Sequence, residues 1–194
     1  MILNDLEHDI LTEIATIGGG NASEALSKLL KQKVFVKVPD VRTASIEGIP
    51  DLMGTTEQIM TTVAIKISGD ATGVVVFLFT PEDAKKLASE IMQTQTISVV
   101  EEIANILVGN SLTALSQFLQ MKFSQSVPLS ATDMLRAVIN EIMSELGGQT
   151  DTILLLKISF MVNTFLVGGS VYFLFDPTST EKILNACKQK TAVT

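Results

Sequence analysis

The sequence predicts an α+β fold in which two copies of one unit share an antiparallel sheet of about six strands. Three features of the 194 residues support this prediction. Two long stretches of the chain resemble each other, runs of valine, isoleucine and phenylalanine alternate with stretches of helical periodicity, and 46% of the residues are hydrophobic. Because paired helices and branched runs recur in the same order, we expect a pseudo-twofold arrangement around one buried sheet.

The duplication can be followed directly in the sequence. The stretch at 13–39 aligns with the stretch at 102–128 after a shift of 89 residues, and 13 of the 27 aligned positions are identical. Two shorter matches follow in the same order: IKIS (65–68) with LKIS (156–159), and FLFTP (77–81) with FLFDP (173–177). The offset grows to 91 and then to 96, which predicts longer loops in the second copy. We therefore expect one domain over 1–194, built of two repeats at about 5–92 and 94–190.

The first copy begins with a predicted amphipathic helix over 5–17. Its apolar residues recur at spacings of four, four and three: Leu6, Ile10, Ile14 and Ile17. Glycines 18–20 are expected to end this helix, so that a second helix over 21–31 folds back in a tight hairpin. Runs of β-branched and aromatic residues predict a strand at 34–38 and a β-hairpin of strands 61–68 and 73–79. A proline in the first turn predicts a helix at 81–91.

The second copy is expected to repeat this order with one addition. The addition is a helical stretch at 132–146. The predicted elements are paired helices at about 97–108 and 110–120, a strand near 122–128, the extra helix, strands near 152–160 and 164–175, and a closing helix after Pro177.

Composition excludes several classes of protein. A net charge of −7 without any basic stretch opposes sequence-independent binding to nucleic acid. The longest apolar run, at 73–79, is far shorter than the roughly 20 residues that a membrane-spanning helix needs. Acidic residues stand near the N-terminus where a signal peptide carries positive charge. We therefore expect a cytoplasmic protein with no nucleic-acid partner and no membrane partner.

Few residues suggest metal or nucleophilic chemistry. A single cysteine, Cys187, excludes an internal disulfide and a multi-cysteine metal site, and it reads as a packing residue. His8 is the only histidine and has no companions at metal-ligand spacing, so we expect no metal site. The glycines at 18–20 match no phosphate-binding pattern.

A polar stripe on the helix predicted at 97–108 is the main candidate site. Ser98, Glu102 and Asn105 fall at positions i, i+4 and i+7, away from the apolar stripe of that helix. A solvated helix face explains most such stripes. Here, however, the first copy carries Asp9, Glu13 and Thr16 at the equivalent positions, so the stripe recurs with its carboxylate kept.

These residues carry a resemblance to a known family. The run Ser98-x3-Glu102-x2-Asn105-x22-Pro128 resembles the signature of the CheC, CheX and FliY family of chemotaxis phosphatases. The duplicated context EIxxIxxGNxxxALSxxL resembles the CheC branch in particular. Because the pattern lies inside two copies of one repeat, the resemblance extends over nearly the whole chain.

The resemblance implies an enzyme that hydrolyses the aspartyl phosphate of the response regulator CheY. Phosphorylated CheY would carry the Mg²⁺, so the chain itself would need no cofactor. Glu102 would pair with a lysine in the partner's active site, and Asn105 would orient a water for attack on phosphorus. Such positioning suits phosphoryl transfer, which has a loose transition state. Ser98 and Pro128 would support the helix and the adjoining strand.

The first copy departs from the family pattern at one position. Asp9, Glu13 and Pro39 match it, but Thr16 stands where the water-positioning amide belongs. A single hydroxyl lacks the paired carbonyl and NH2 of an amide. We therefore expect this site to be weak or inactive, with Glu13 still able to dock a partner.

A non-catalytic interaction protein is the alternative. It would be either an adaptor that binds the receptor deamidase CheD, or a protein that binds phosphorylated CheY in the manner of the flagellar switch. Because the sequence ends at Thr194, it leaves little room for the additional C-terminal domain that switch proteins carry. The phosphatase is therefore the leading expectation, and the sequence does not show which surface would bind CheD.

Overall fold

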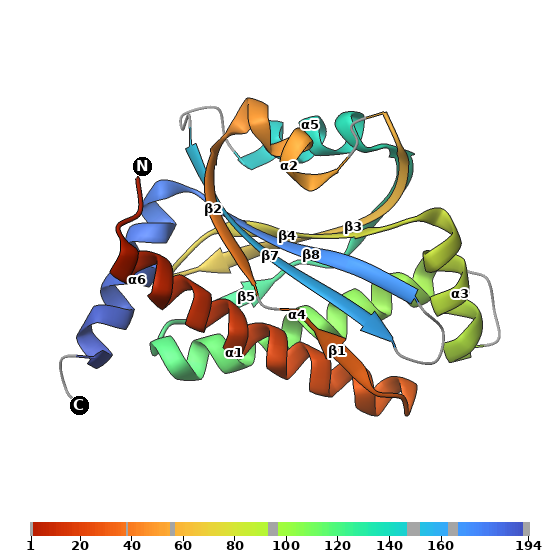
Figure 1. The fold of residues 1–194 in the computed structure, drawn as a ribbon, viewed down its shortest axis with the longest axis horizontal. Coiled ribbons are helices and arrows are strands. Elements are labelled where there is room, and N and C mark those ends of the chain that lie inside the picture. The colour runs from red at the N-terminus through yellow and green to blue at the C-terminus, as the bar shows by residue number, and fades with distance from the viewer. Residues whose placement is uncertain are drawn as a thin grey trace.

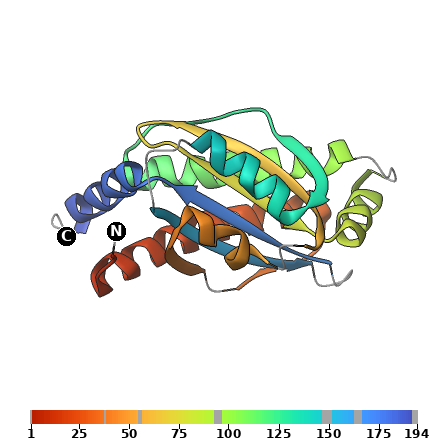
Figure 2. The ribbon, with the colours of Figure 1, turned by 90° about the horizontal axis from the view of Figure 1, so that it is seen from above.

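Helices cover both faces of a curled antiparallel sheet (Figure 1). The computed structural model describes residues 2–37, 39–54, 57–92, 97–146, 152–162 and 167–191. One hydrophobic core lies between the sheet and helices α1, α3, α4 and α6, and a second lies between the sheet and helices α2 and α5. Figure 2 shows α2 and α5 over the sheet from above. This arrangement confirms the predicted α+β class.

The same order of elements occurs twice along the chain. The first series is α1 (Asp5–Leu30), β1 (Val34–Val36), β2 (Asp40–Ser45), a short 3-10 helix η1 (Ile46–Gly48), α2 (Ile49–Met53), β3 (Ile59–Gly69), β4 (Gly73–Phe79) and α3 (Pro81–Met92). The second series is α4 (Ile97–Leu119), β5 (Phe123–Gln125), β6 (Leu129–Met134), α5 (Leu135–Leu146), β7 (Thr152–Val162), β8 (Val167–Phe175) and α6 (Pro177–Thr191). No helix within the described ranges is both long and apolar enough to span a bilayer.

The predicted helical hairpins are wrong, because α1 and α4 are each one uninterrupted helix. Gly18 and Gly19 are buried inside α1, at the point where it packs on α4 and on β7. A Cβ at Gly19 would lie 3.2 Å from Cγ2 of Ile158, and one at Gly18 would lie 3.8 Å from the side chain of Ser111. The glycines therefore permit close packing of a helix and do not form a turn.

The sheet has more strands than predicted. A path of six strands, β1-β7-β8-β4-β3-β5, matches the expected number, while β2 also pairs with β7 and β6 also pairs with β3. The helix predicted from residue 132 begins only at Leu135, because 129–134 form strand β6. That helix has a counterpart in the first copy, since the five-residue α2 occupies the place of the twelve-residue α5.

The two copies exchange strands. Strands β1 and β2 of the first copy pair with β7 of the second, and β5 and β6 of the second copy pair with β3 of the first. At the centre of the sheet β4 pairs with β8, and Val76 lies opposite Tyr172. These two residues are equivalent at the offset of 96, so the local twofold axis passes through this pair.

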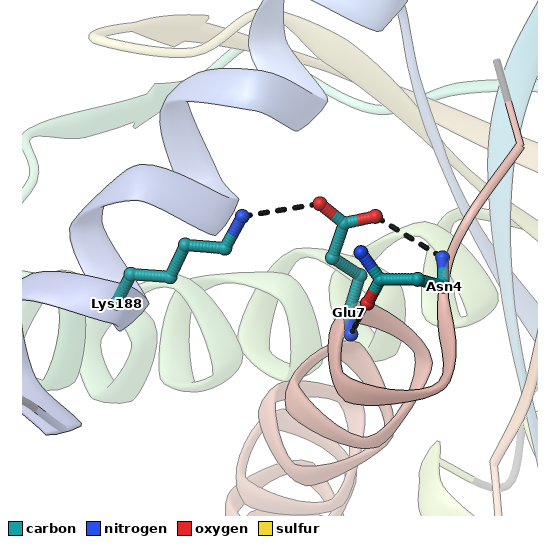
Figure 3. A network of polar contacts seen from close by, with 3 residues as sticks. All are labelled: Asn4, Glu7 and Lys188. Atoms are coloured by element: carbon teal, nitrogen blue, oxygen red, sulfur yellow. Dashed lines mark hydrogen bonds and ion pairs between the residues drawn. The ribbon is translucent and has the colours of Figure 1, made fainter.

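The start of α1 is fixed by a capping box that also reaches α6 (Figure 3). The side chain of Asn4 accepts a hydrogen bond from the backbone N–H of Glu7 at 2.9 Å, and the Glu7 carboxylate accepts one from the backbone N–H of Asn4 at 3.2 Å. Nζ of Lys188 on α6 donates to the other Glu7 oxygen at 3.1 Å. The Asn4 N–H and then the Lys188 ammonium hold the pKa of Glu7 below its ordinary value.

Candidate functional site

The predicted polar stripe lies on the outer side of α4. Ser98 and Glu102 are exposed and Asn105 is half-buried, while Ile103 and Ala104 between them face the core. Spacings of four and three place the three polar side chains one above another on the helix. Within the described residues, no hydrogen bond or ion pair holds the Glu102 carboxylate. The structure therefore brings Glu102 and Asn105 together, with the carboxylate open to a partner.

The amide of Asn105 is held by a residue on the neighbouring strand. Nε2 of Gln125, the last residue of β5, lies 2.7 Å from Oδ1 of Asn105 and 3.2 Å from the main-chain oxygen of Asn105. Both distances are those of hydrogen bonds. Sequence reasoning missed Gln125, which lies twenty residues from Asn105. The one available signal was the alignment of the two copies, which sets Gln125 against a valine.

A second side-chain bond ties α4 to the next strand. Oγ of Ser130 on β6 donates to the Glu101 carboxylate at 2.5 Å. Pro128, which is half-buried, lies in the link between β5 and β6, between Gln125 and Ser130. The segment around Pro128 is thus fastened to α4 on both sides of the proline.

The first copy keeps the exposed stripe without the amide. Asp9, Glu13 and Thr16 are all exposed on α1, and Pro39 is half-buried directly before β2. The Thr16 hydroxyl donates to the main-chain oxygen of Thr12 at 2.8 Å, within its own helix. That bond occupies the hydroxyl proton and leaves a lone pair, but no NH2 donor, at this position.

The first copy also lacks the two ties to the strands. At the offset of 89, Val36 is the counterpart of Gln125 and Val41 is the counterpart of Ser130. Valine side chains form no hydrogen bonds, so neither tie exists around α1. The difference between the two sites therefore extends from the helix to the strands behind it.

The two stripes lie toward opposite ends of an antiparallel helix pair. Helix α1 passes beside α4 with Gly18 near Ser111, and Ile14 lies toward Leu115 and Leu119. Glu13 and Thr16 therefore lie beside the C-terminal half of α4, whereas Glu102 and Asn105 belong to its N-terminal half. The structure does not combine the stripes into one site, so each would meet a partner separately.

A comparison with known protein families finds a match at the residues of this stripe. A model of the CheC-like family matches residues 97–129, a range that includes Ser98, Glu102, Asn105 and Pro128. The chain is 28% identical over 157 residues to the CheY-P phosphatase CheC of Bacillus subtilis (strain 168), and the alignment covers 75% of each chain.

Two FliY proteins are also similar. The flagellar motor switch phosphatase FliY of Bacillus subtilis (strain 168) is 24% identical over 198 residues, which cover 95% of this chain and 50% of that protein. This chain therefore spans about half the length of that relative. The crystal structure of FliY from Thermotoga maritima has a TM-score of 0.79 at 18% identity, covering 98% of this chain and 100% of that one. The family-model and sequence matches confirm the resemblance expected from the stripe, because the chain is similar to the CheC-like family and to CheC and FliY proteins.

Proposed function

We propose that this protein accelerates the loss of the aspartyl phosphate from phosphorylated CheY, with Glu102 and Asn105 as its working site. The observation that carries the proposal is the pairing of an exposed carboxylate with a hydrogen-bonded amide, one helical turn apart on the same side of α4. The relative named as a CheY-P phosphatase supports the choice of substrate.

The proposed reaction is hydrolysis of the acyl phosphate. The oxygen of a water forms a bond to phosphorus while the bond from phosphorus to the aspartate oxygen breaks. The electron pair stays with the aspartate carboxylate, and the water proton leaves with the phosphate product or passes to solvent. The transition state is loose, so orienting the water supplies much of the acceleration.

Each residue has one task in this scheme. Asn105 holds the water through its amide, while Glu102 pairs with a lysine of the receiver protein and aligns α4 over the phosphoryl group. Any Mg²⁺ would come with CheY. Recognition then depends on the local Glu102 contact, because a net charge of −7 provides no long-range attraction to a negatively charged phosphoryl group.

The first site is assigned to docking. Glu13 is exposed as Glu102 is, but Thr16 uses its hydroxyl proton within the helix, and the strand position that corresponds to Gln125 is the apolar Val36. This site would hold a phosphorylated receiver without hydrolysing it. If both sites bind a partner and neither hydrolyses the phosphate, the protein is the non-catalytic adaptor or switch-like protein that is the alternative to a phosphatase.

The test is the rate of phosphate release from purified phospho-CheY. We expect acceleration by the wild type, loss of acceleration with retained binding for Asn105→Ala, and weaker binding and slower release for Glu102→Ala. Asn110→Ala is the matched control, because Asn110 is an exposed asparagine on the same helix whose amide, among the described residues, bonds only the main-chain oxygen of Ile106. Equal release with wild type and both site variants would refute the phosphatase assignment, and intact binding without acceleration would establish the adaptor.

A further inference from the structure

The geometry points to Gln125 as a positioning residue that fixes which way the Asn105 amide faces. This inference rests on the proposed function, because the amide matters only if it orients a water. Gln125 lies on β5, outside the polar stripe, and is half-buried. It would act on the reaction through Asn105 and would not itself touch the phosphoryl group.

The direction of both hydrogen bonds follows from one atom. The main-chain oxygen of Asn105 can only accept, so the Gln125 atom 3.2 Å from it must be the donor Nε2. The same Nε2 lies 2.7 Å from the side chain of Asn105 and carries a second hydrogen. The Asn105 atom that meets it must therefore be the acceptor Oδ1, and Nδ2 faces the other way.

This orientation decides what the amide offers to a water. An asparagine amide has an acceptor end and a donor end, and a half-turn about its last bond exchanges them. With Gln125 in place, one lone pair of Oδ1 is occupied and the second lone pair remains for a water hydrogen. Donation from Gln125 also polarises the amide, which makes the Nδ2 hydrogens of Asn105 better hydrogen-bond donors.

The glutamine is poorly suited to a purely structural role. Its Oε1 is buried and has no hydrogen-bond partner within the described part of the chain, which is an unfavourable state for a polar atom. In the first copy, where Thr16 replaces the amide, the counterpart of Gln125 is the apolar Val36. The fold therefore tolerates valine at this position. The glutamine is present in the copy that has the asparagine and absent from the copy that has threonine in its place.

The lack of a side chain at Gly109 leaves room for Gln125 beside the helix. Gly109 lies one turn after Asn105 on α4, and a Cβ built on it would have Oε1 and Nε2 of Gln125 as its nearest neighbours, at 3.6 and 3.8 Å. The Gln125 amide thus lies against the bare backbone of Gly109 while its Nε2 reaches Asn105. Gly109 belongs to the duplicated context EIxxIxxGN, whereas Gln125 lies outside both family patterns.

The experiment compares Gln125→Val and Gln125→Glu in the release assay with phospho-CheY. Valine removes the donor and the unpartnered Oε1, so we expect a maximal rate about tenfold lower, an unchanged half-saturating concentration, and a melting temperature equal to or above that of the wild type. Glutamate keeps the shape but can only accept, so it favours the reversed Asn105 amide and lowers the rate further. Gln117→Glu, at an exposed position on α4, controls for the added charge.

Side-chain amide resonances in a nitrogen-edited NMR spectrum provide a readout that does not depend on catalysis. We expect the Asn105 NH2 pair to shift in Gln125→Val and again in Gln125→Glu, and to stay unchanged in Gln117→Glu. No shift would show that the two amides are not bonded, which would overturn the inference.

The outcomes separate this inference from the proposed function. If Gln125→Val matches the wild-type rate while Asn105→Ala is inactive, Gln125 has no positioning role and the phosphatase assignment stands. A slower rate accompanied by an equal loss of affinity or of melting temperature would make Gln125 merely structural. If wild type and Asn105→Ala do not differ, the phosphatase assignment fails and the positioning role fails with it.

Discussion

The hydroxyl of Ser111 on α4 donates a hydrogen bond to the main-chain oxygen of Gly18 on α1 at 3.0 Å. Ser111 is only 2% exposed, so this bond lies in the buried interface (the seam) between α1 and α4, the two helices that carry the stripes. The seam fixes how the helices lie against each other, and with it the separation of the two sites.

Replacing Ser111 with alanine should destabilise the protein by about 1 kcal/mol, because a buried hydrogen bond is lost while Gly18 keeps its helical one. Urea denaturation of Ser111→Ala measures the change. The control is Thr113→Ala, because the exposed Thr113 hydroxyl donates to the main-chain oxygen of Gly109 within its own helix. A Ser111→Ala variant as stable as the control would show that the bond contributes nothing to the seam.

Two neighbouring glycines in α1 should respond to alanine in opposite ways. Gly19→Ala places a methyl group 3.2 Å from Ile158 and should cost about 1–3 kcal/mol through overpacking. Gly20 is exposed and has no atom within 4 Å of its missing Cβ, so Gly20→Ala should gain up to about 1 kcal/mol of helix propensity. Thermal unfolding of both variants measures the difference. Destabilisation by Gly20→Ala would contradict a continuous helix.

The charge on Glu7 should stabilise the fold only where the carboxylate is ionised. Its folded pKa lies below the ordinary value of about 4.5, so the stabilisation is complete above that value and is lost as the pH falls through the folded pKa. Glu7→Gln keeps a capping amide but removes the charge. We expect it to cost about 0.5 kcal/mol near neutral pH, given that Lys188 is half-exposed.

Urea denaturation of wild type and Glu7→Gln near pH 7 and again at about pH 3 tests this prediction. The deficit of the variant should shrink at the lower pH. A deficit that stays constant or grows on acidification would mean that Glu7 acts through its shape and not through its charge. Glu57→Gln, at an exposed position, serves as the control.

The first site should gain substantial activity only when both the asparagine and its strand donor are supplied. In an Asn105→Ala background, which silences the second site, Thr16→Asn alone should release phosphate only slightly faster than that background. Adding Val36→Gln supplies the strand donor and should raise the rate further. Equal rates for the single and double changes would argue against a role for the strand glutamine, and no gain from either would show that the site lacks something else.

The sequence predicted the elements whose signal is local. Strands β3, β4, β7 and β8 consist of branched and aromatic runs, and helix α3 begins at a proline, so each was found close to its observed bounds. Strands β2 and β6, DVRTAS and LSATDM, were missed because they are polar edge strands whose pairing comes from β7 and β3.

The errors arose where distant packing overrides local chemistry. Three consecutive glycines predict a turn, and only the approach of Ile158 to Gly19 explains why they lie inside a helix. The stripe of Glu102 and Asn105 was visible because helical spacing is local, whereas Gln125 reaches Asn105 through the tertiary structure. Sequence reasoning therefore found the exposed half of the site and missed the half beneath it.

The exchange of strands has a consequence for how the chain acquires its structure during synthesis. When the first ninety or so residues have left the ribosome, β3 has β4 on one side but still lacks β5 and β6, and β1 and β2 still lack β7. Their partners lie far away in sequence, which gives the fold a high contact order and slow folding. The nascent first half cannot finish its sheet, so folding should wait until synthesis is almost complete and then proceed as one cooperative event.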